Sequence, residues 1–367
     1  MNRNFPTSTS QKPIKALSHN ATIRDALQKI NETKCLLCVF EIEQTNKVAV
    51  LTDSDIRKSL LKGAQLTDKA LNWANHNPVT AKPEASNDEL TKLAKIYRYR
   101  EIPIVDQYGK LQDIFIHHDQ PSDQAPGNKS ILPNSLFILA GGSGERLKSV
   151  VQDRPKPLAN VGDRPILQTL ILSARASGIR KFFISVNYLA HQIEEHLKEK
   201  VYSELDITII REHKKLGTAG SIGLIEDNCN HPLLVCNADI LTKVEFDKLL
   251  YAHTETNADI TCAVREHKVQ IPFGVMKIKN DNITDIEEKP ESIYHVNAGI
   301  YVLERSVTQH IPLDKYFDMP QLIGKVIQSG GVVAPFLVHE YWKDVGQPED
   351  FFSANREYSF HFKDLVL

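Results

Sequence analysis

The stretch that decides the fold runs from residue 136 to residue 158 and reads LFILAGGSGERLKSVVQDRPKPL. Its first five residues, 136–140, are apolar and predict a short buried strand. The strand stops at a glycine-rich turn, residues 141–144, which is followed by Arg146 and then by Lys156 between two prolines. Glycines let backbone N–H groups turn toward an anion because no Cβ blocks the approach. Since an arginine and a lysine can neutralise a polyphosphate, the spacing predicts a phosphate-binding turn.

This turn lacks the patterns of the two commonest phosphate-binding loops. No Gly-Lys-Ser/Thr follows at P-loop spacing, and the glycines do not form the dinucleotide-binding G-x-G-x-x-G pattern. Taken alone, such a turn is equally compatible with a purely structural role. The whole stretch, however, resembles the signature of sugar-1-phosphate nucleotidyltransferases, in which G-G-x-G-x-R-L and P-K-P-L form the loop over a nucleoside triphosphate. The resemblance implies catalytic roles for Arg146 and Lys156 and a nucleotide site at Leu139, Ala140, Gly141, Gly142, Ser143 and Gly144.

Two details refine this resemblance. Residues 149–151 (Ser-Val-Val) and the following Asp153 are most similar to the guanylyltransferase branch, which acts on heptose- or hexose-type sugar phosphates. Glu145 is a departure, because the family usually carries a threonine there, and it places an acid beside the phosphates.

Length and composition set the broad class. A chain of 367 residues is too long for one ordinary core, so we expect two domains. The net charge of −2 and the lack of a long basic run do not suggest nucleic acid as a partner. No apolar run reaches the length of a membrane span, and the N-terminus does not resemble a signal peptide. Five cysteines, an odd number, argue against a disulfide framework and favour the cytoplasm.

Residues 14–119 contain an internal repeat of roughly 60 residues with alternating helices and strands, which implies two stacked copies sharing one core. LTDSDIRKSLLKG in the first half and IPIVDQYGKL in the second resemble a tandem CBS pair, a module that often binds adenine nucleotides. The resemblance implies that Thr52 and Asp55 hold the ribose, although the second half has no matching T-x-x-D. The alternatives are that the acids only cap a helix, or that the pair is a dimerisation surface.

The predicted fold class is α/β. We assign residues 1–122 to the CBS pair, 123–134 to a linker and 135–367 to the nucleotidyltransferase domain. In this last segment strands alternate with helices, including helices over 167–178 and 221–228. Such a βαβ series predicts a mostly parallel, Rossmann-like sheet, which the resemblance identifies as GT-A-like. Ligands bind such sheets where the carboxyl ends of the strands converge.

A second glycine-containing segment, Leu-Gly-Thr-Ala-Gly at residues 216–220, follows a predicted strand and opens a helix. Small residues at a helix start allow a flat ring or a phosphate to approach the backbone. Close packing of the helix is the alternative explanation. In the nucleotidyltransferases this segment borders the nucleobase and ribose, so the resemblance places Gly217, Thr218 and Gly220 in the nucleotide site.

Two acids are candidate Mg²⁺ ligands. Asp239 follows an apolar strand, and a carboxylate there suits an ion that prefers one or two carboxylates plus phosphate oxygens. An Asx turn or a helix cap would explain this acid equally well. Residues 342–350 resemble the family motif W-x-D-[IV]-G-x-P-E-D, whose first aspartate, here Asp344, is implied as the second metal ligand.

The resemblance also implies a sugar-phosphate site. In the Glu-Lys-Pro motif, Lys289 would hold the phosphate of the sugar-1-phosphate as a further catalytic residue, with Glu288 and Asn297 near the sugar hydroxyls. Gly274 belongs to a Pro-Phe-Gly-Val motif that matches the family's loop closing over the sugar. A solvated surface lysine is the alternative for Lys289.

Together these features predict a Mg²⁺-dependent enzyme that transfers a nucleotidyl group from a nucleoside triphosphate to a sugar-1-phosphate. GTP and a mannose-, glucosamine- or heptose-type sugar are favoured, for bacterial surface-glycan or nonulosonic acid precursors. The alternatives are a uridylyl- or thymidylyltransferase of the glucose-1-phosphate type and a non-catalytic nucleotide sensor. The attacking phosphate oxygen is already anionic, so the absence of a persuasive histidine–acid pair among 14 histidines fits this chemistry. We expect a cytoplasmic homo-oligomer without nucleic-acid or membrane partners.

Overall fold

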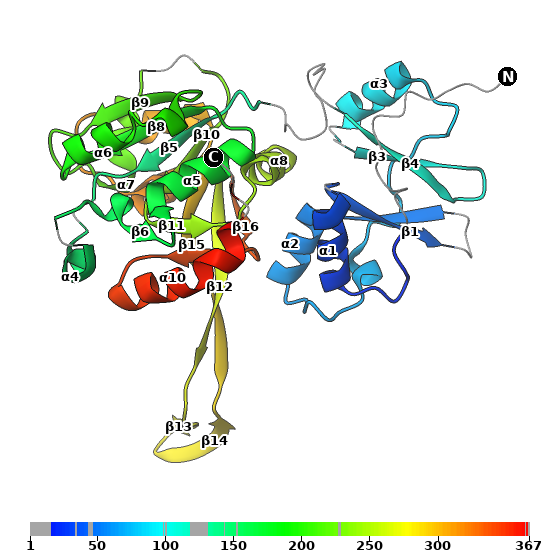
Figure 1. Ribbon diagram of the computed structural model, residues 1–367. Helices are drawn as coiled ribbons and strands as arrows, with labels where there is room; N and C mark the ends of the chain where they lie inside the picture. The colour runs from blue at the N-terminus through cyan, green and yellow to red at the C-terminus, as the bar shows by residue number, and fades with distance from the viewer. Residues whose placement is uncertain are drawn as a thin grey trace. The chain divides into compact units, whose positions relative to one another are not determined.

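The computed structural model describes residues 16–33, 35–42, 47–97, 99, 101–117, 131–142, 144–151, 153–226, 229–363 and 365. The chain divides into two units, Met1–Ser130 and Ile131–Leu367. In Figure 1 the first unit is blue to cyan and the second runs from green to red. No helix in the described ranges combines the length and the apolar character that crossing a membrane requires.

The first unit contains two parts, each built around one strand pair. The first half contains α1 (Ile23–Thr33), β1 (Leu37–Ile42), β2 (Lys47–Thr52), α2 (Asp53–Leu61) and η1 (Ala70–Trp73), and the second contains α3 (Asn87–Tyr97), β3 (Glu101–Val105) and β4 (Leu111–Ile116). Each half has one antiparallel strand pair, β1–β2 and β3–β4. Ile114 of β4 packs in one apolar cluster with Leu37, Val39, Val48 and Val50 of the first half. The two strand pairs therefore share a core, while the internal repeat itself stays a prediction.

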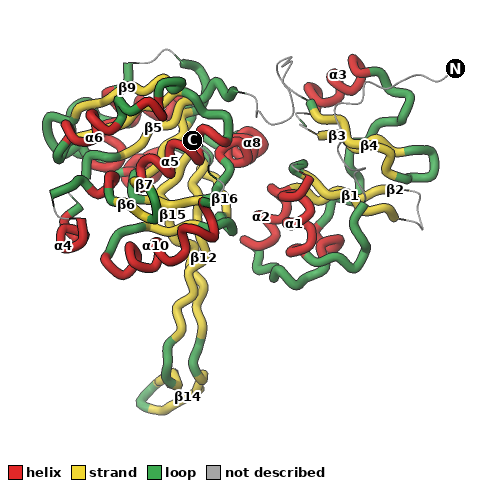
Figure 2. Tube along the Cα trace, in the orientation of Figure 1, coloured by secondary structure: helices red, strands yellow, loops and turns green. Residues whose placement is uncertain are grey.

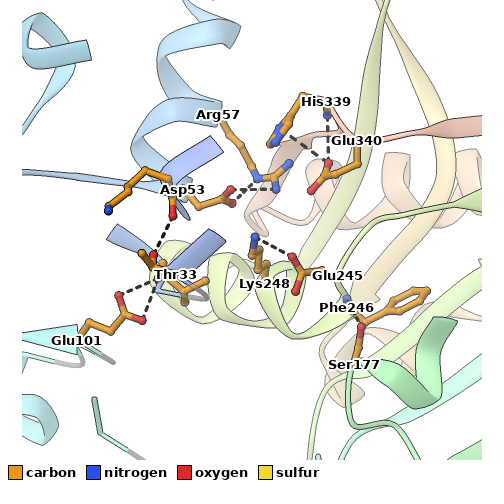
Figure 3. A network of polar contacts seen from close by, with 12 residues as sticks. Thr33, Asp53, Arg57, Glu101, Ser177, Glu245, Phe246, Lys248, His339 and Glu340 are labelled. Carbon is orange, nitrogen blue, oxygen red and sulfur yellow. Dashed lines mark hydrogen bonds and ion pairs between the residues drawn. The ribbon is translucent and has the colours of Figure 1, made fainter. Parts of the chain in front are cut away.

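Thr52 and Asp55 form a capping box at the start of α2. The Asp55 N–H donates to the Thr52 hydroxyl oxygen at 3.0 Å, while the Asp55 carboxylate accepts from the Thr52 N–H at 3.1 Å and from its hydroxyl at 2.7 Å. The neighbouring Asp53 forms an ion pair with Arg57 one turn later, at 2.6 Å (Figure 3). The helix-capping alternative therefore describes these residues, and the ribose contact stays a prediction.

The second unit is built on a seven-stranded sheet of order β16-β12-β15-β10-β5-β8-β9. Its strands are β5 (Ser135–Leu139), β8 (Lys181–Val186), β9 (Asp206–Arg211), β10 (Leu233–Asn237), β12 (Ile260–Gln270), β15 (Glu291–Leu303) and β16 (Val333–Leu337). Strands β10, β5, β8 and β9 are parallel neighbours, as are β12 and β16, whereas β15 runs antiparallel to both β10 and β12. The prediction of a mostly parallel α/β sheet is confirmed.

Helices cover both faces of this sheet (Figure 2). They are α4 (Lys148–Val151), α5 (Ile166–Ala176), α6 (Ala190–His196), α7 (Gly217–Gly220), α8 (Phe246–Thr256), α9 (Met319–Gln328) and α10 (Pro348–Phe362), with 3₁₀ turns η2 (Glu145–Leu147), η3 (Lys156–Leu158), η4 (Lys200–Tyr202), η5 (Ser221–Leu224) and η6 (Arg305–His310). Because side chains alternate along a strand, Leu136 and Ile138 of β5 pack with α5 and α8, and Phe137 packs with α9 on the other face. The Phe246 N–H donates to the Ser177 hydroxyl at 3.1 Å, which fixes α8 against the end of α5 (Figure 3).

The helix predicted over residues 221–228 is wrong. The one-turn helix α7 is followed only by the 3₁₀ turn η5, after which the backbone at Ile225 is extended. Gly223 lies inside this turn, and a glycine in a helix interior costs about 1 kcal/mol relative to alanine. Residues 227 and 228 lie outside the described residues.

Short strands complete the unit. Two pairs, β6 (Asn160–Val161) with β7 (Arg164–Pro165) and β11 (Ile240–Thr242) with β17 (Trp342–Asp344), lie outside the main sheet. Strands β12 and β15 continue beyond the sheet as a ribbon, whose outer end carries β13 (Gly274–Lys279) and β14 (Asn282–Glu288) (Figure 1). We call residues 265–296 the arm. The sequence analysis did not predict it.

Candidate active site

The candidate site lies where β5 and β10 end side by side. These strands are parallel, and their register pairs Leu139 with Asn237, the last residue of each strand. The Ala238 N–H donates to the Leu139 carbonyl at 3.2 Å. The glycine turn that follows β5 and the acid that follows β10 therefore leave the same edge of the sheet, as the sequence predicts.

Asp239, Asp344 and Lys156 meet at this edge. Asp239 lies in the turn between β10 and β11, and the antiparallel pairing of β11 with β17 sets Asp344 opposite Ile240. The Val345 N–H donates to the Asp239 carbonyl at 2.9 Å, which fixes the backbone spacing of the two acids. Between them lies the ammonium of Lys156, 2.5 Å from Asp239 Oδ2 and 3.9 Å from Asp344 Oδ1. The structure thus brings together three of the predicted residues that are up to 188 positions apart in the chain.

The charges of this cluster leave a place for a cation. Lys156 is only 8% exposed, and Asp239 Oδ1 is buried without a hydrogen-bond partner. Partial burial, and then the charge of Asp239, raises the pKa of Asp344, while Lys156 and Arg146 act to lower it. No group of three or more His, Cys, Asp or Glu side chains forms a metal site among the described residues. Two carboxylates with an unsatisfied oxygen fit Mg²⁺, which takes its other ligands from phosphates and water.

The glycine turn has one open and one crowded position. A Cβ built at Gly142 would have no neighbour within 4 Å, so the backbone there is open to a ligand. A Cβ at Gly144, where φ is +60°, would lie 2.9 Å from the Cβ of Lys156. Gly144 therefore lets the turn close onto Lys156, and Arg146 follows in η2 with its side chain exposed. Ser143 lies outside the described residues.

The segment at residues 216–220 packs tightly against Phe317 and Asp318. The Thr218 N–H donates to the Asp318 carboxylate at 2.9 Å, and the Gly220 N–H donates to the Phe317 carbonyl at 2.9 Å. A Cβ at Gly217 would lie 2.6 Å from the Phe317 carbonyl oxygen, and one at Gly220 would lie 2.7 Å from the carbonyl oxygen of residue 315. Close packing, the alternative raised from the sequence, thus explains both glycines. The predicted nucleotide contact of this segment stays a prediction.

Glu212 is a residue that the sequence analysis missed. It directly follows β9, and its carboxylate accepts from the Leu216 N–H at 3.3 Å. A Cβ at Gly141 would lie 2.8 Å from Glu212 Oε1, so the carboxylate packs on the glycine turn. Burial raises the pKa of Glu212. The signal was present in the sequence, since an acid directly after a parallel strand lies at the edge where ligands bind.

The predicted sugar-phosphate residues are divided between two places. Asn297 lies at the base of the arm, opposite Val264, and its side chain accepts from the Gly299 N–H at 2.9 Å. Gly274 and Glu288 are paired in the β13–β14 hairpin, and Lys289 follows them with φ +48°. The paired strands β12 and β15 carry these last three residues away from the main sheet (Figure 1), and their role in binding the sugar phosphate stays a prediction.

A glycine turn, a buried lysine and two acids at the carboxyl edge of a parallel sheet are features of an α/β protein that handles phosphorylated nucleotides. The chain belongs to the nucleotidyl transferase family, whose sequence profile matches residues 136–360. The prediction of this family is therefore confirmed for the second unit. The CBS resemblance of the first unit remains a prediction.

Several relatives are similar to this second unit. The probable mannose-1-phosphate guanylyltransferase 1 of Oryza sativa is 28% identical over 231 residues, which is 60% of this chain and 64% of the relative. The mannose-1-phosphate guanyltransferase of Yarrowia lipolytica is 32% identical over 227 residues, 59% of this chain and 62% of the relative. The chain therefore spans just under two thirds of the length of these relatives.

Solved structures similar to the chain include HddC from Yersinia pseudotuberculosis, at 27% identity and a TM-score of 0.49, covering 61% of this chain and 99% of HddC. A further structure of HddC was determined in complex with GMP-PN, at 27% identity and a TM-score of 0.48, with the same coverage.

Proposed function

We propose that the chain catalyses Mg²⁺-dependent transfer of a guanylyl group from GTP to a sugar-1-phosphate of the mannose, glucosamine or heptose type. The products are a GDP-sugar and pyrophosphate. Membership of the nucleotidyl transferase family supports the reaction class. The mannose-1-phosphate guanylyltransferases among its relatives support the base and the sugar class.

The observation that carries this proposal is the cluster of Lys156, Asp239 and Asp344. Its two carboxylates, one with an unpartnered buried oxygen, fit Mg²⁺, which would supply charge neutralisation of the phosphates when bound. The ammonium of Lys156 is held by salt bridges to two acids, so its position is set before any substrate arrives. A solvated surface lysine would have no such fixed position.

The chemistry needs alignment and charge neutralisation more than proton transfer. A phosphate oxygen of the sugar-1-phosphate attacks the α-phosphorus of the triphosphate, and the bond to the bridging oxygen of the β-phosphate breaks, so pyrophosphate leaves with the electron pair. In this assignment Lys156 neutralises the α-phosphate and Arg146 the leaving pyrophosphate. The N–H groups of the glycine turn donate to the phosphate oxygens. No side chain needs to remove a proton, because the attacking oxygen is anionic at neutral pH.

Glu212 supports guanine over uracil or thymine. Guanine presents two adjacent donors, the ring N1–H and the exocyclic amino group, and one carboxylate can accept from both. Uracil and thymine present one ring N–H between two carbonyl groups, so a carboxylate facing them would meet a repelling oxygen. Glu212 lies against the glycine turn, where a base attached to the bound triphosphate is within reach.

The first unit has a separate proposal. We propose that it is a CBS-like pair that regulates or assembles the enzyme, supported by its two halves with a shared core. The capping role of Thr52 and Asp55 favours assembly over binding of a ribose at these two side chains. A change in activity on adding AMP or ATP would instead identify a sensor.

The test is pyrophosphate release by the full chain with Mg²⁺, crossing the common nucleoside triphosphates with glucose-, mannose-, glucosamine- and heptose-1-phosphates. We expect one productive pair that contains GTP. Asp239→Asn should lower the turnover at least about 100-fold, because it removes charge at the metal and leaves Lys156 without its closest acid. The matched control is Asp206→Asn, an exposed aspartate at the amino end of β9, which should keep full turnover. Silence of a folded protein across the whole grid would favour the binding-only alternative.

A further inference from the structure

The hairpin at the tip of the arm has one apolar and one charged face. Its register pairs Met276 with Ile286 and Ile278 with Ile283, so these four side chains share a face. All four are more than half exposed, from 54% for Met276 to 71% for Ile278. On the other face Lys277 forms an ion pair with Asp285 at 2.9 Å. This is the pattern of a sheet that packs one side on a core, but here the apolar side is exposed.

Exposed apolar side chains are concentrated on the arm. Nine of the seventeen large hydrophobic residues that are exposed within the described ranges fall between residues 269 and 294. Soluble proteins rarely leave such a group of apolar side chains uncovered, and a two-stranded hairpin is marginally stable by itself in water. The arm therefore requires a surface on which to pack.

The candidate site lacks what the arm carries. Lys289, the predicted ligand of the sugar phosphate, follows the hairpin in a left-handed backbone conformation that costs a lysine conformational energy. The pairing of β12 with β15 is continuous over seven residue pairs, from Val264–Asn297 to Gln270–Glu291, which is about 20 Å of ribbon. Bending the arm back over its own site would break this hydrogen-bonded ladder, whereas docking on another molecule leaves it intact.

We propose that two copies of the chain exchange their arms, so that the hairpin and Lys289 of each copy complete the candidate site of the other. The inference rests on the proposed function, since it assigns Lys289 to the sugar phosphate. A second copy is the occupant that the structure favours, because each chain carries both parts and a two-fold exchange satisfies both at once. The second unit also has exposed apolar side chains outside the arm. Leu313 and Tyr316 are 76% and 60% exposed, and they precede Phe317, whose carbonyl accepts hydrogen bonds from the 216–220 segment.

The exchange is tested by combining two inactive variants. Asp239→Asn inactivates the part of the site that the sheet of one copy supplies, and Lys289→Ala inactivates the part that the arm of the other copy supplies. Neither homodimer should therefore release pyrophosphate. Co-expressed with different tags and purified through both, a mixed dimer has one site with two intact parts and should regain about half of the wild-type activity. An active wild-type enzyme whose mixed dimer stays inactive would overturn the exchange and leave the proposed function standing.

A second readout does not need activity. A photoreactive benzoylphenylalanine at position 289 should yield a covalent dimer whose cross-linked peptide contains Asp239 or its neighbours. Ile286→Asp should convert the dimer into a monomer in sedimentation, whereas Lys279→Gln, on the charged face of the same hairpin, should keep it. Cross-links within one chain, or a wild-type monomer, would refute the exchange. A cross-linked dimer without turnover on any substrate pair would support the exchange and refute the proposed function.

Discussion

Gly142→Ala separates folding from nucleotide binding at the glycine turn. The added methyl group meets no protein atom within 4 Å, and the backbone at Gly142 does not have the positive φ that disfavours alanine. The variant should therefore fold as well as the wild type, or gain up to about 1 kcal/mol through the reduced entropy of the unfolded chain. The space that the methyl group enters is the space assigned to the triphosphate.

The expected loss follows from the hydrogen bonds at stake. A methyl group that holds a phosphate oxygen away from the turn removes one charge-assisted hydrogen bond, worth about 1.5–3 kcal/mol. This corresponds to a fall in kcat/KM of about 10- to 100-fold, with Tm unchanged or raised. Pyrophosphate release and thermal unfolding measure the two quantities.

The matched control is Gly324→Ala, in α9, where an added methyl group also meets no neighbour. It should leave kcat/KM unchanged. Wild-type kcat/KM in Gly142→Ala would refute the assignment of the glycine turn to the phosphates. A fall in Tm would refute the reading of Gly142 as an open position.

Three further substitutions test other parts of the second unit. Glu212→Gln should lower kcat/KM for GTP at least about 10-fold and reduce the preference for GTP over UTP, since an amide cannot accept from both guanine donors; an unchanged preference would remove Glu212 from base recognition. Gly217→Ala should lower Tm by about 4–8 °C, because φ is +77° and the methyl group would meet the Phe317 carbonyl oxygen at 2.6 Å. The hydrogen bond from Lys343 lowers the pKa of Glu357 to about 2 in the folded protein. In the unfolded chain the pKa of a glutamate is about 4.3, so the carboxylate stabilises the fold at pH values above about 4.3 and loses this effect as the pH falls toward 2. Because solvent screens this exposed pair, Glu357→Gln should lower the free energy of unfolding by about 1 kcal/mol at pH 7 and by little at pH 2. Thermal unfolding at both pH values measures this difference, and an equal loss of Tm at both would exclude the ionic contribution.

Local patterns predicted the main sheet because its determinants are local. The strand predicted at residues 136–140 is an apolar run that ends at glycines, and α5, mostly apolar and buried, ends at Ala176, two residues before Gly178. The failure at residues 221–228 has a local cause too, since two short turns containing Gly217, Gly220 and Gly223 replace the helix. The arm could not be predicted in the same way. Strands of 11 and 13 residues read as ordinary strands, and nothing in their sequence states that their outer halves leave the sheet.

The phosphate side of the site was predictable because each residue follows a strand whose direction the sheet fixes. Asp239 and the glycine turn meet because β5 and β10 are parallel neighbours; the alternation of strands and helices predicts the parallel direction, and the sheet order supplies the neighbour relation. The meeting of Asp344 with Asp239 depends on the separate β11–β17 pair, which only the family resemblance indicated. Glu212 was missed because its role depends on touching Gly141, and a contact between residues 71 positions apart leaves no trace in a single sequence.

The charges around Lys156 connect the fold to the proposed chemistry. Without substrate, the lysine is nearly buried between two acids, and a buried ammonium without such partners would be costly. Its partners are the same acids that would hold the Mg²⁺ ion of the proposed function, and Asp239 Oδ1 has no hydrogen-bond partner of its own. In that proposal, bound phosphate oxygens would offer the ammonium other acceptors. Under the proposed function, the two salt bridges would keep buried Lys156 stable before substrate binds, and the phosphate oxygens would then take over as acceptors of its ammonium.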